Sequence, residues 1–519
     1  MIIVTTQQMQ QMDKNTIENF GIPGRVLMEN AGRGALEILS EYFELEGARV
    51  AVVAGRGNNG GDGFVIGRYL MEMGVSVSFF LLSTRERVQG DARANMDLVL
   101  DLLAEHSLSQ FIEIPDQESL EAAAGILADH DLFVDAIFGT GLNSDIRGVY
   151  RDVIELINDS GKAVFSVDIP SGINADTGAV CGVAIQADAT ATFAFAKAGH
   201  ILYPGNFYTA DLEVIDIGIP GHIAKAQSPN IFLPEPHDIA GLIPARDFNA
   251  HKGSFGHLLV LAGSPGKTGA AALCANAAVR TGAGLVTLGV PERLMPVMEP
   301  MVIEPMAAAL AQTPSGGLDA AALDDIVSLL ADKAALALGP GMGTDSGTRE
   351  LIKSIIPIAS VPMVLDADGL NCIADDPDIL HTAKAPVILT PHPGEMARLT
   401  GKTTADVQNN RMETARNFAE TYKVILVLKG AQTLVACPDG AVFICPTGNP
   451  GMACGGMGDV LTGMIAAFLT QGLAPESAAL AGVYIHGLCG DLLAEEHAVG
   501  FSASDMVAGI PCALGTVLS

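Results

Sequence analysis

The sequence predicts an α/β protein of two domains built on parallel sheets. Short runs rich in β-branched residues alternate with helical stretches, which is the pattern of parallel sheets covered by helices. Glycine-rich loops directly follow several of these runs. The chain has 519 residues, 49% of them hydrophobic. At roughly 150 residues per domain, this length can bury more than one core.

Each half of the chain contains its own set of expected strands. In the first half they are Arg49–Ala54, Val75–Leu82, Leu132–Ile137, Val164–Asp168, Thr190–Ala194 and Leu212–Ile217. In the second half they are His257–Ala262, Leu285–Val290, Ala335–Leu338, Met363–Asp366, Val387–Thr390 and Val424–Leu428. A hairpin is expected from Thr433–Cys437 and Ala441–Cys445, because Pro-Asp-Gly between them favours a turn.

A proline-rich segment separates the two halves. Its prolines are Pro220, Pro229, Pro234, Pro236 and Pro244. Proline interrupts helices and central strands, so this segment predicts a linker or surface crossing at residues 221–245. The first domain would then cover residues 1–220 and the second residues 246–519.

The composition argues against several classes of partner. Asp and Glu number 59 and Lys and Arg 29, a formal net charge of −30, so neither nucleic acid nor an anionic membrane is an expected partner. None of the eight cysteines forms a CxxC pair, and the start of the chain lacks the features of a secretory signal. No unbroken apolar run reaches the ~18 residues of a membrane span. We therefore expect a cytoplasmic protein.

A first glycine-rich loop follows the strand Arg49–Ala54. Gly55, Gly57 and Gly60 match the G-x-G-x-x-G pattern between a strand and a helical stretch. Such a loop lets the backbone approach a phosphate, and the following helix offers free amides to it. No carboxylate ends the next strand, as a dinucleotide site would require, so a tight structural turn is the alternative. The segment favours a Rossmann-like three-layer domain.

Other expected strands of the first half also end in polar residues. Asp135 and Asp168 close two strands, and Ser171 lies just beyond the second. Ligands of open α/β sheets bind outside the carboxyl ends of the strands, so these residues could meet Asn59 and Asp62 there. Each aspartate alone could be a loop cap, but together they indicate a site. The oxygen donors of Asn59, Asp135 and Ser171 also suit a hard cation.

A second glycine-rich loop precedes a helical stretch near the end of the chain. Gly455, Gly456 and Gly458 would leave bare amides at the helix start, an anion hole for a phosphoryl group in transfer. Asp459 falls in the first turn, where it could take a proton from an attacking hydroxyl. The alternative is that Asp459 only caps the helix. The pattern resembles the GxGD signature of the ribokinase-like superfamily.

Further motifs of the second half fit one cleft for a nucleotide and a substrate. GPGMG (Gly339–Gly343), LDADGLN (Leu365–Asn371) and VLKGAQT (which contains Lys429–Thr433) each follow or end an expected strand. His392 and Glu395 lie in a turn that enters a helix. A lone histidine there would ordinarily be a cap or a core residue, so the case for His392 depends on its position.

The motifs together resemble the bifunctional NAD(P)H-hydrate repair enzymes over nearly the whole chain. They appear in matching order as GRGNNGGDG, VDIPSG, KGSFGHLLVLAGS, GPGMG, LDADGLN, LTPHPGEMARL, VLKGAQT and GNPGMACGGMGDVLTG. The resemblance implies an N-terminal NAD(P)H-hydrate epimerase with a Rossmann-like fold. It also implies a C-terminal, ADP-dependent NAD(P)H-hydrate dehydratase with a ribokinase-like α/β fold.

The resemblance assigns roles to individual residues. Asp168 would be the acid and base of the epimerase at C6 of the hydrated ring, and Asp459 the base of the dehydratase. The epimerase would bind its substrate through Asn58, Asn59, Gly60, Gly61, Asp62, Gly139, Thr140, Gly141, Leu142, Asn143, Ser144, Asp145 and Asp168. The dehydratase would contact the hydrate through Ala270, Gly341, His392 and Asp459, and the adenine nucleotide through Lys429, Gly430, Ala431, Gln432, Thr433 and Gly458. Asn59, Asp135 and Ser171 would hold a potassium ion.

The resemblance also implies co-substrates and partners. The epimerase would interconvert the R and S hydrates with K⁺ bound. The dehydratase would return the S hydrate to NAD(P)H with ADP as phosphoryl donor and Mg²⁺ as metal. A homo-oligomer is expected. Nothing in the residues separates ADP from ATP, or NADH hydrate from NADPH hydrate.

Two other functions are compatible with parts of the sequence. The C-terminal half could be a kinase of a small alcohol, such as a vitamin precursor, although the fused NNGGDG domain argues against it. Both halves could instead be nucleotide-sensing modules without catalysis. Asp168 and Asp459 argue against that, because binding alone needs no proton acceptor beside an anion hole.

Overall fold

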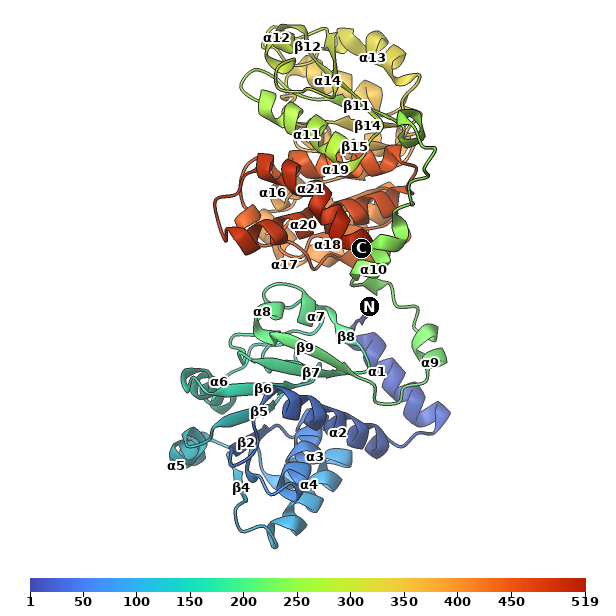
Figure 1. The fold of residues 1–519 in the computed structure, drawn as a ribbon. Coiled ribbons are helices and arrows are strands. Elements are labelled where there is room, and N and C mark those ends of the chain that lie inside the picture. Colours follow the sequence, from blue (N-terminus) through green and yellow to red (C-terminus); the bar gives the residue numbers. More distant parts are fainter. The chain divides into compact units, whose positions relative to one another are not determined.

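The computed structural model describes all 519 residues, and the chain forms two compact units. One unit comprises Ile2–Ile231, and the other comprises Phe232–Ser519 together with Met1 (Figure 1). Both are of the predicted α/β class.

The N-terminal unit is built on a seven-stranded sheet in the order β4-β3-β2-β5-β6-β7-β9. All neighbouring strands are parallel. The strands are β2 (Arg49–Ala54), β3 (Ser76–Leu81), β4 (Gln110–Glu113), β5 (Leu132–Ala136), β6 (Ala163–Val167), β7 (Ala189–Phe193) and β9 (Asp211–Ile215). The strand order reverses between β2 and β5, so the loops after these strands diverge and leave room for a ligand.

Helices cover both faces of this sheet, because side chains alternate between the faces along each strand. Val50 and Val52 point to one face and Ala51 and Val53 to the other. The first face packs against α2 (Gly24–Tyr42), α3 (Asn58–Glu72) and α4 (Gly90–Leu103). The second packs against α5 (Gln117–Ala128) and α6 (Val149–Asp159) (Figure 1). The result is the expected three-layer domain.

The start of the chain forms a separate small layer of the N-terminal unit. β1 (Ile2–Val4) pairs in parallel with β8 (Ala196–Lys197), which leads into α7 (Ala198–Ile201) and α8 (Gly205–Thr209). α1 (Thr6–Lys14) follows β1 and continues into a π-helical turn at Asn15–Phe20.

The C-terminal unit contains a larger sheet with the order β13-β12-β11-β14-β15-β16-β17-β18-β19. Its strands are parallel up to β17, and β18 and β19 run antiparallel to their neighbours. The strands are β11 (His257–Leu261), β12 (Leu285–Pro291), β13 (Met306–Leu310), β14 (Ala335–Leu338), β15 (Met363–Leu365), β16 (Val387–Leu389), β17 (Ile425–Leu428), β18 (Leu434–Ala436) and β19 (Val442–Ile444).

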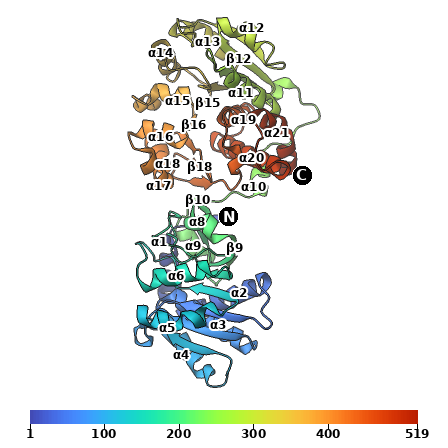
Figure 2. The same ribbon diagram turned by 90° about the vertical axis from the view of Figure 1, so that its left-hand side faces the viewer.

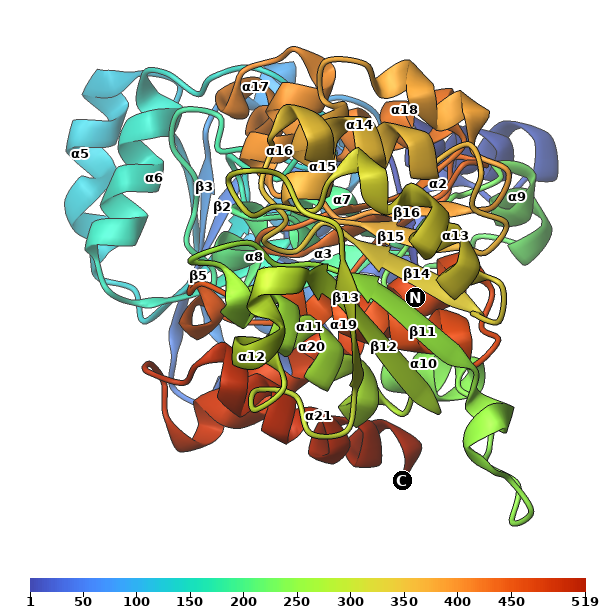
Figure 3. The same cartoon turned by 90° about the horizontal axis from the view of Figure 1, so that it is seen from above.

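Two groups of helices cover this second sheet (Figures 2 and 3). The main core lies between the sheet and α10 (Pro236–Leu242), α11 (Thr268–Thr281), α12 (Met295–Met298), α19 (Met457–Thr470), α20 (Pro475–Glu496) and α21 (Ala503–Leu518). The opposite face carries α13 (Leu323–Leu330), α14 (Ser346–Ile355), α15 (Asp368–Ile373), α16 (Pro393–Thr400), α17 (Thr404–Asn409) and α18 (Arg411–Tyr422). One helix, α20, has the length and hydropathy of a membrane span, and 67% of its apolar window is buried inside the protein.

The predicted strands are all present, but other strands were missed. The edge strands β4 and β13 lack a strong strand pattern, since QFIE is half polar and MAAAL is alanine-rich. The strands β1, β8 and β10 (Ile231–Phe232) are only two or three residues long.

The segment predicted as a linker contains short helices, so the expectation that its prolines exclude helical structure is wrong. α9 (Gly221–Ala226) begins after Pro220, and α10 has Pro236 at its first position. Proline is tolerated at a helix start because the first amides have no partner within the helix.

Candidate active sites

A cavity of about 710 Å³ lies at the reversal point of the N-terminal sheet. Its walls are the segments after β2, β5 and β6, together with α1. This is where an open α/β sheet is expected to bind a ligand.

Most of the residues predicted for this site line the cavity. They are Asn58, Asn59, Asp62, Gly139, Thr140, Gly141, Leu142, Asn143, Ser144 and Asp168. Gly60 and Gly61 pack beneath it instead. A Cβ atom at Gly60 would collide with the Gly55 carbonyl, and one at Gly61 with Met28. Asp145, Asp135 and Ser171 are not part of the lining.

The first glycine-rich loop is shorter than expected. α3 begins at Asn58, so NNGGD forms its first turns instead of an extended loop. Glycine weakens helices, which is why the helix was expected to start later. Here close packing offsets that cost, since Gly63 and Gly67 face Val52 of β2. Asn58–Asp62 therefore lie at a helix N-terminus, where backbone amides face the cavity.

Asp168 forms a buried ion pair that the sequence did not indicate. Lys197 Nζ donates to Asp168 Oδ1 over 2.8 Å, and its side chain is only 1% exposed. The Thr192 hydroxyl donates to the same oxygen over 3.2 Å. The backbone of Asp168 is left-handed, with φ +66°, and its carbonyl accepts from Nε2 of His200. A strained residue held by several partners is typical of functional sites.

The ion pair keeps Asp168 ionised. Burial raises the pKa of Asp168, but Lys197 outweighs it, so the pKa lies below the ordinary value. Burial and Lys197 lower the pKa of His200 to about 4, so this histidine is neutral. Asp168 can therefore accept a proton at neutral pH.

The side chains of the three residues predicted to hold potassium offer oxygen atoms as ligands: an amide oxygen, a carboxylate and a hydroxyl. The amide nitrogen of Asn59 is their only other polar atom. Both polar atoms of the Asn59 side chain are buried without a partner. Asp135 is fully buried and accepts from the Ser171 hydroxyl over 2.5 Å and from the Ser171 amide over 2.8 Å. The unpartnered side-chain oxygen of Asn59 and the oxygens of Asp135 and Ser171 fit a hard monovalent cation.

In the C-terminal unit, Asp459 lies in the first turn of α19 and does not cap it. The N-cap is Gly456, with φ +96°, and no side chain caps the helix. The alternative interpretation of Asp459 as a capping residue therefore does not hold. Burial and the nearby Asp366 raise the pKa of Asp459 to about 7, against the opposing effect of Lys429. A carboxyl group with this pKa is suited to proton transfer near neutral pH.

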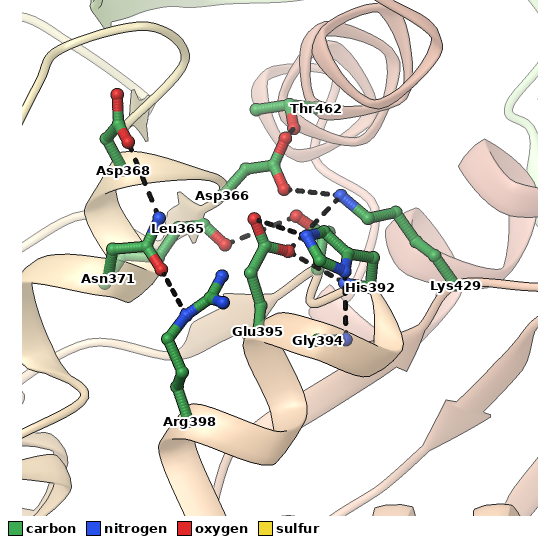
Figure 4. A network of polar contacts seen from close by, with 11 residues as sticks. Leu365, Asp366, Asp368, Asn371, His392, Gly394, Glu395, Arg398, Lys429 and Thr462 are labelled. Carbon is green, nitrogen blue, oxygen red and sulfur yellow. Dashed lines mark hydrogen bonds and ion pairs between the residues drawn. The ribbon is translucent and has the colours of Figure 1, made fainter. Parts of the chain in front are cut away.

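Asp366, which helps to raise the pKa of Asp459, is the centre of a buried polar network (Figure 4). Lys429 Nζ donates to Asp366 Oδ1 over 2.8 Å, and Thr462 of α19 donates to Asp366 Oδ2 over 2.9 Å. Burial lowers the pKa of Lys429, but Asp366 and Glu395 outweigh it and raise the pKa above its usual value. The network connects the loop after β15, the loop after β17 and the helix that carries Asp459.

The other residues predicted for the dehydratase site also lie beyond the carboxyl ends of the strands of this sheet. His392 is the N-cap of α16, where Gly394 N–H donates to its Nδ1 and Glu395 accepts from its backbone amide. A Cβ atom on Gly341 would touch Ala270, so these two residues are neighbours. Gly458 lies beside the Lys429 ammonium in the same way.

Arg411 supports the Lys429–Thr433 loop from below. Its guanidinium donates to the carbonyls of Leu428, Ala431 and Gln432. No carboxylate pairs with it, and burial lowers its pKa to about 10. A Cβ atom on Gly430 would lie 3.0 Å from two of its nitrogens. The loop is therefore wrapped around a partly buried cation.

Lys197 and Arg411 belong to no motif that the sequence analysis identified. Lys197 comes from the two-residue strand β8, and Arg411 opens an otherwise polar helix. Only the pattern of a lone cation beside small residues, as in FAKAGH, could have drawn attention to Lys197.

Comparisons with known proteins match both units. The profile of the NAD(P)H-hydrate dehydratase family matches residues 258–511, and the profile described as YjeF-related protein N-terminus matches residues 24–199. The bifunctional NAD(P)H-hydrate repair enzyme Nnr of Moorella thermoacetica is 42% identical, over 99% of this chain and 97% of that protein. Its namesake from Thermofilum pendens is 38% identical, over 96% and 93%.

Solved structures similar to the chain include a Bacillus subtilis protein described as an ADP/ATP-dependent NAD(P)H-hydrate dehydratase co-crystallised with ATP and Mg²⁺. It is 32% identical, covers 56% of this chain and 99% of its own, and has a TM-score of 0.48.

Proposed function

Since the chain belongs to the family of bifunctional NAD(P)H-hydrate repair enzymes, we propose that its two units carry out the two steps of that repair. The N-terminal unit is the NAD(P)H-hydrate epimerase. The C-terminal unit is the NAD(P)H-hydrate dehydratase, with ADP as phosphoryl donor.

The epimerase site receives the hydrated nicotinamide nucleotide in the 710 Å³ cavity. The amides at the start of α3 and the Gly139–Ser144 loop bind its phosphates. Epimerisation requires the C6 hydroxyl to leave and a hydroxyl to return on the other face, next to the ring nitrogen. Asp168, held as an anion by Lys197, takes the proton of the incoming water.

A potassium ion belongs to this proposal. Asn59, Asp135 and Ser171 would hold it, and when bound it would supply positive charge near the substrate phosphates. The orphaned amide of Asn59 supports this assignment, because a buried polar group without a partner is costly unless a ligand satisfies it.

The dehydratase site receives the S hydrate beside Ala270, Gly341 and His392, and the adenine nucleotide on Lys429–Thr433 and Gly458. Asp459 removes the proton of the C6 hydroxyl, the oxygen attacks the terminal phosphate of ADP, and AMP leaves. The lone pair of the ring nitrogen then expels phosphate from C6, and loss of a proton from C5 of the resulting iminium restores NAD(P)H. The amides at the start of α19 stabilise the charge on the phosphoryl group in transfer.

A magnesium ion would neutralise the phosphates of the nucleotide. No group of three or more His, Cys, Asp or Glu side chains forms a metal site in the protein. The residues therefore fit an ion that arrives with the nucleotide, as Mg²⁺ commonly does, and do not fit a resident ion in a protein cage.

The observation that carries the dehydratase assignment is the position of Asp459. It lies at the glycine-rich start of α19, does not cap the helix and has a pKa of about 7. The test is incubation with both epimers of NADPH hydrate, ADP and Mg²⁺. We expect release of phosphate and full recovery of the absorbance of the reduced nicotinamide ring. Accumulation of a phosphorylated product would indicate a kinase. Recovery of NADPH from one epimer alone would show that the N-terminal unit has no epimerase activity.

Arg411→Met is expected to weaken nucleotide binding. The change removes the guanidinium that donates to three carbonyls of the Lys429–Thr433 loop, and hydrogen bonds to a charged group contribute about 1.5–3 kcal/mol each. We expect the KM for ADP to rise about tenfold or more, equivalent to at least about 1.4 kcal/mol. The kcat should change less. Steady-state kinetics with varied ADP measures this.

Arg416→Met is the matched control for Arg411→Met. Arg416 belongs to the same helix, and burial lowers its pKa as well, but its guanidinium contacts Met412 and not the loop. Its KM for ADP should stay at the wild-type value. An equal rise in both variants would mean that the loop does not depend on Arg411.

A further inference from the structure

The epimerase cavity contains a further carboxyl group that the proposed mechanism does not yet use, that of Asp13. Asp13 lies near the end of α1 and lines the cavity together with Asp168, Asp62 and Lys197. Its side chain makes no hydrogen bond, unlike that of Asp168. Its side chain is partly exposed, and the exposed part faces the cavity.

α1 is held firmly enough to position this carboxyl group. A capping box between Thr5 and Gln8 fixes its start. Its buried residues Met9 and Met12 pack against Ile223 and Ala224 of α9. A π-helical turn begins two residues after Asp13, and such turns are often found at functional sites.

The charges around Asp13 set it apart from Asp168. It faces Lys197 of β8, Asp168 after β6 and Asp62 of α3. Burial raises the pKa of Asp13 to about 6, with Lys197 lowering it and Asp168 raising it. Lys197 donates directly to Asp168 and not to Asp13, so Asp168 is the more acidic of the two. One proton shared by this pair therefore lies on Asp13.

The proposed reaction needs two groups in opposite protonation states. The leaving hydroxyl needs a proton donor on one face of the ring, and the incoming water needs a proton acceptor on the other. Asp168 meets only the second need, because Lys197 keeps it ionised. Carboxyl groups whose environments separate their pKa values commonly divide the acid and base roles in this way.

We propose that Asp13 is a second catalytic residue of the epimerase and the proton donor to the departing C6 hydroxyl. This inference rests on the epimerase function proposed above. Asp13 gives its proton to the hydroxyl, the C6–O bond breaks, and the lone pair of the ring nitrogen forms an iminium bond to C6. Water then adds to the opposite face and gives its proton to Asp168. The proton returns from Asp168 to Asp13 through solvent, and the other epimer reacts by the reverse path.

Asp62 is less suited to this role, although it also lines the cavity. Burial raises its pKa well above the usual value, helped by Asp168 and Asp13, which favours its protonated form. It is buried, whereas Asp13 is partly exposed and can exchange its proton with water between turnovers. Asp62 is better placed to donate a hydrogen bond to the substrate than to cycle a proton.

The test is the pH profile of hydrate interconversion by the full chain, measured in both directions. Both directions require Asp13 and Asp168 to hold one proton between them, and this proton is lost as the pH rises through the pKa of Asp13. In the wild type, kcat/KM should therefore fall about tenfold per pH unit above about 6. Asp13→Asn should lose about 10²–10⁴-fold in rate and lose this alkaline limb. Asp13→Glu should restore part of the rate and the limb. Asp62→Asn should react more slowly but keep the limb.

Each other outcome counts against Asp13. If Asp13→Asn keeps the wild-type rate, or reacts slowly with an unchanged alkaline limb, Asp13 is not the donor. Dehydration by the same variant reports whether its C-terminal unit is folded, and a thermal melt shows whether its N-terminal unit is intact. If the wild type itself does not interconvert the epimers while it dehydrates the S hydrate, the epimerase function fails, and the inference fails with it.

Discussion

Asp459→Asn is expected to slow NAD(P)H-hydrate dehydration by about 10²–10⁴-fold and to leave epimerisation unchanged. In the proposed mechanism, the carboxylate at this position takes the proton that would otherwise remain on the attacking hydroxyl. Asparagine keeps the shape of the side chain but cannot accept that proton. Burial and Asp366 raise the pKa of Asp459 to about 7, and a base acts only when ionised. The wild-type dehydration rate should therefore rise with pH through about 7 and then level off.

Asp505→Asn separates this effect from a general effect of acidic residues on helix starts. Asp505 also lies in the first turn of a C-terminal helix, α21, but is exposed and pairs with Ser502. Its substitution should leave the rate and its pH profile unchanged. If Asp459→Asn keeps more than a tenth of the wild-type rate, or keeps the rise near pH 7, another group is the base.

Asp168→Asn is expected to abolish epimerisation and to destabilise the N-terminal unit. Lys197 is 1% exposed and would be left as a buried cation without its carboxylate. Removing one partner of a buried ion pair costs about 3–5 kcal/mol. Denaturant unfolding of the variant measures this cost, and the interconversion of the hydrate epimers measures the activity. The dehydratase should keep its activity wherever the chain remains folded.

The double variant Asp168→Asn, Lys197→Met separates the two roles of Asp168. It removes the unpaired cation, so most of the lost stability should return, because a buried pair can often be replaced by apolar groups at little cost. Epimerisation should stay absent. A double variant as unstable as the single one would show that Asp168 acts through its backbone conformation and not through its charge pair. Epimerisation by either variant would remove Asp168 from the mechanism.

The sheets were predictable because hydrophobic runs and strand ends carry local signals. The strand Arg49–Ala54 is predicted with the bounds that the structure has, and Asp168 is predicted as a site residue because it ends a hydrophobic strand pattern. The start of α3 was not predicted, because its glycines weaken a helix in isolation and only packing against β2 favours it. Pro236 misled in a similar way, since its effect depends on its position within α10.

The partners of the candidate catalytic residues were not predictable from local patterns. Lys197 lies 29 positions from Asp168, and Lys429 lies 63 positions from Asp366, in segments that only the folded chain brings together. Asp13 belongs to an ordinary amphipathic helix, and nothing in its surrounding sequence indicates a cavity. The motifs indicate which loops form the proposed sites, and only the fold brings together the charged groups that shift the pKa values in them.

The claim that one chain holds two independent catalytic sites is tested most directly by complementation between two variants. Asp168→Asn and Asp459→Asn are each supplied with the R hydrate of NADPH, ADP and Mg²⁺. Neither variant alone should restore NADPH above the uncatalysed rate, because one cannot epimerise and the other cannot dehydrate. A mixture of the two should restore NADPH completely, as the wild type does. No recovery by the mixture, or recovery by either variant alone, would contradict the two-site account.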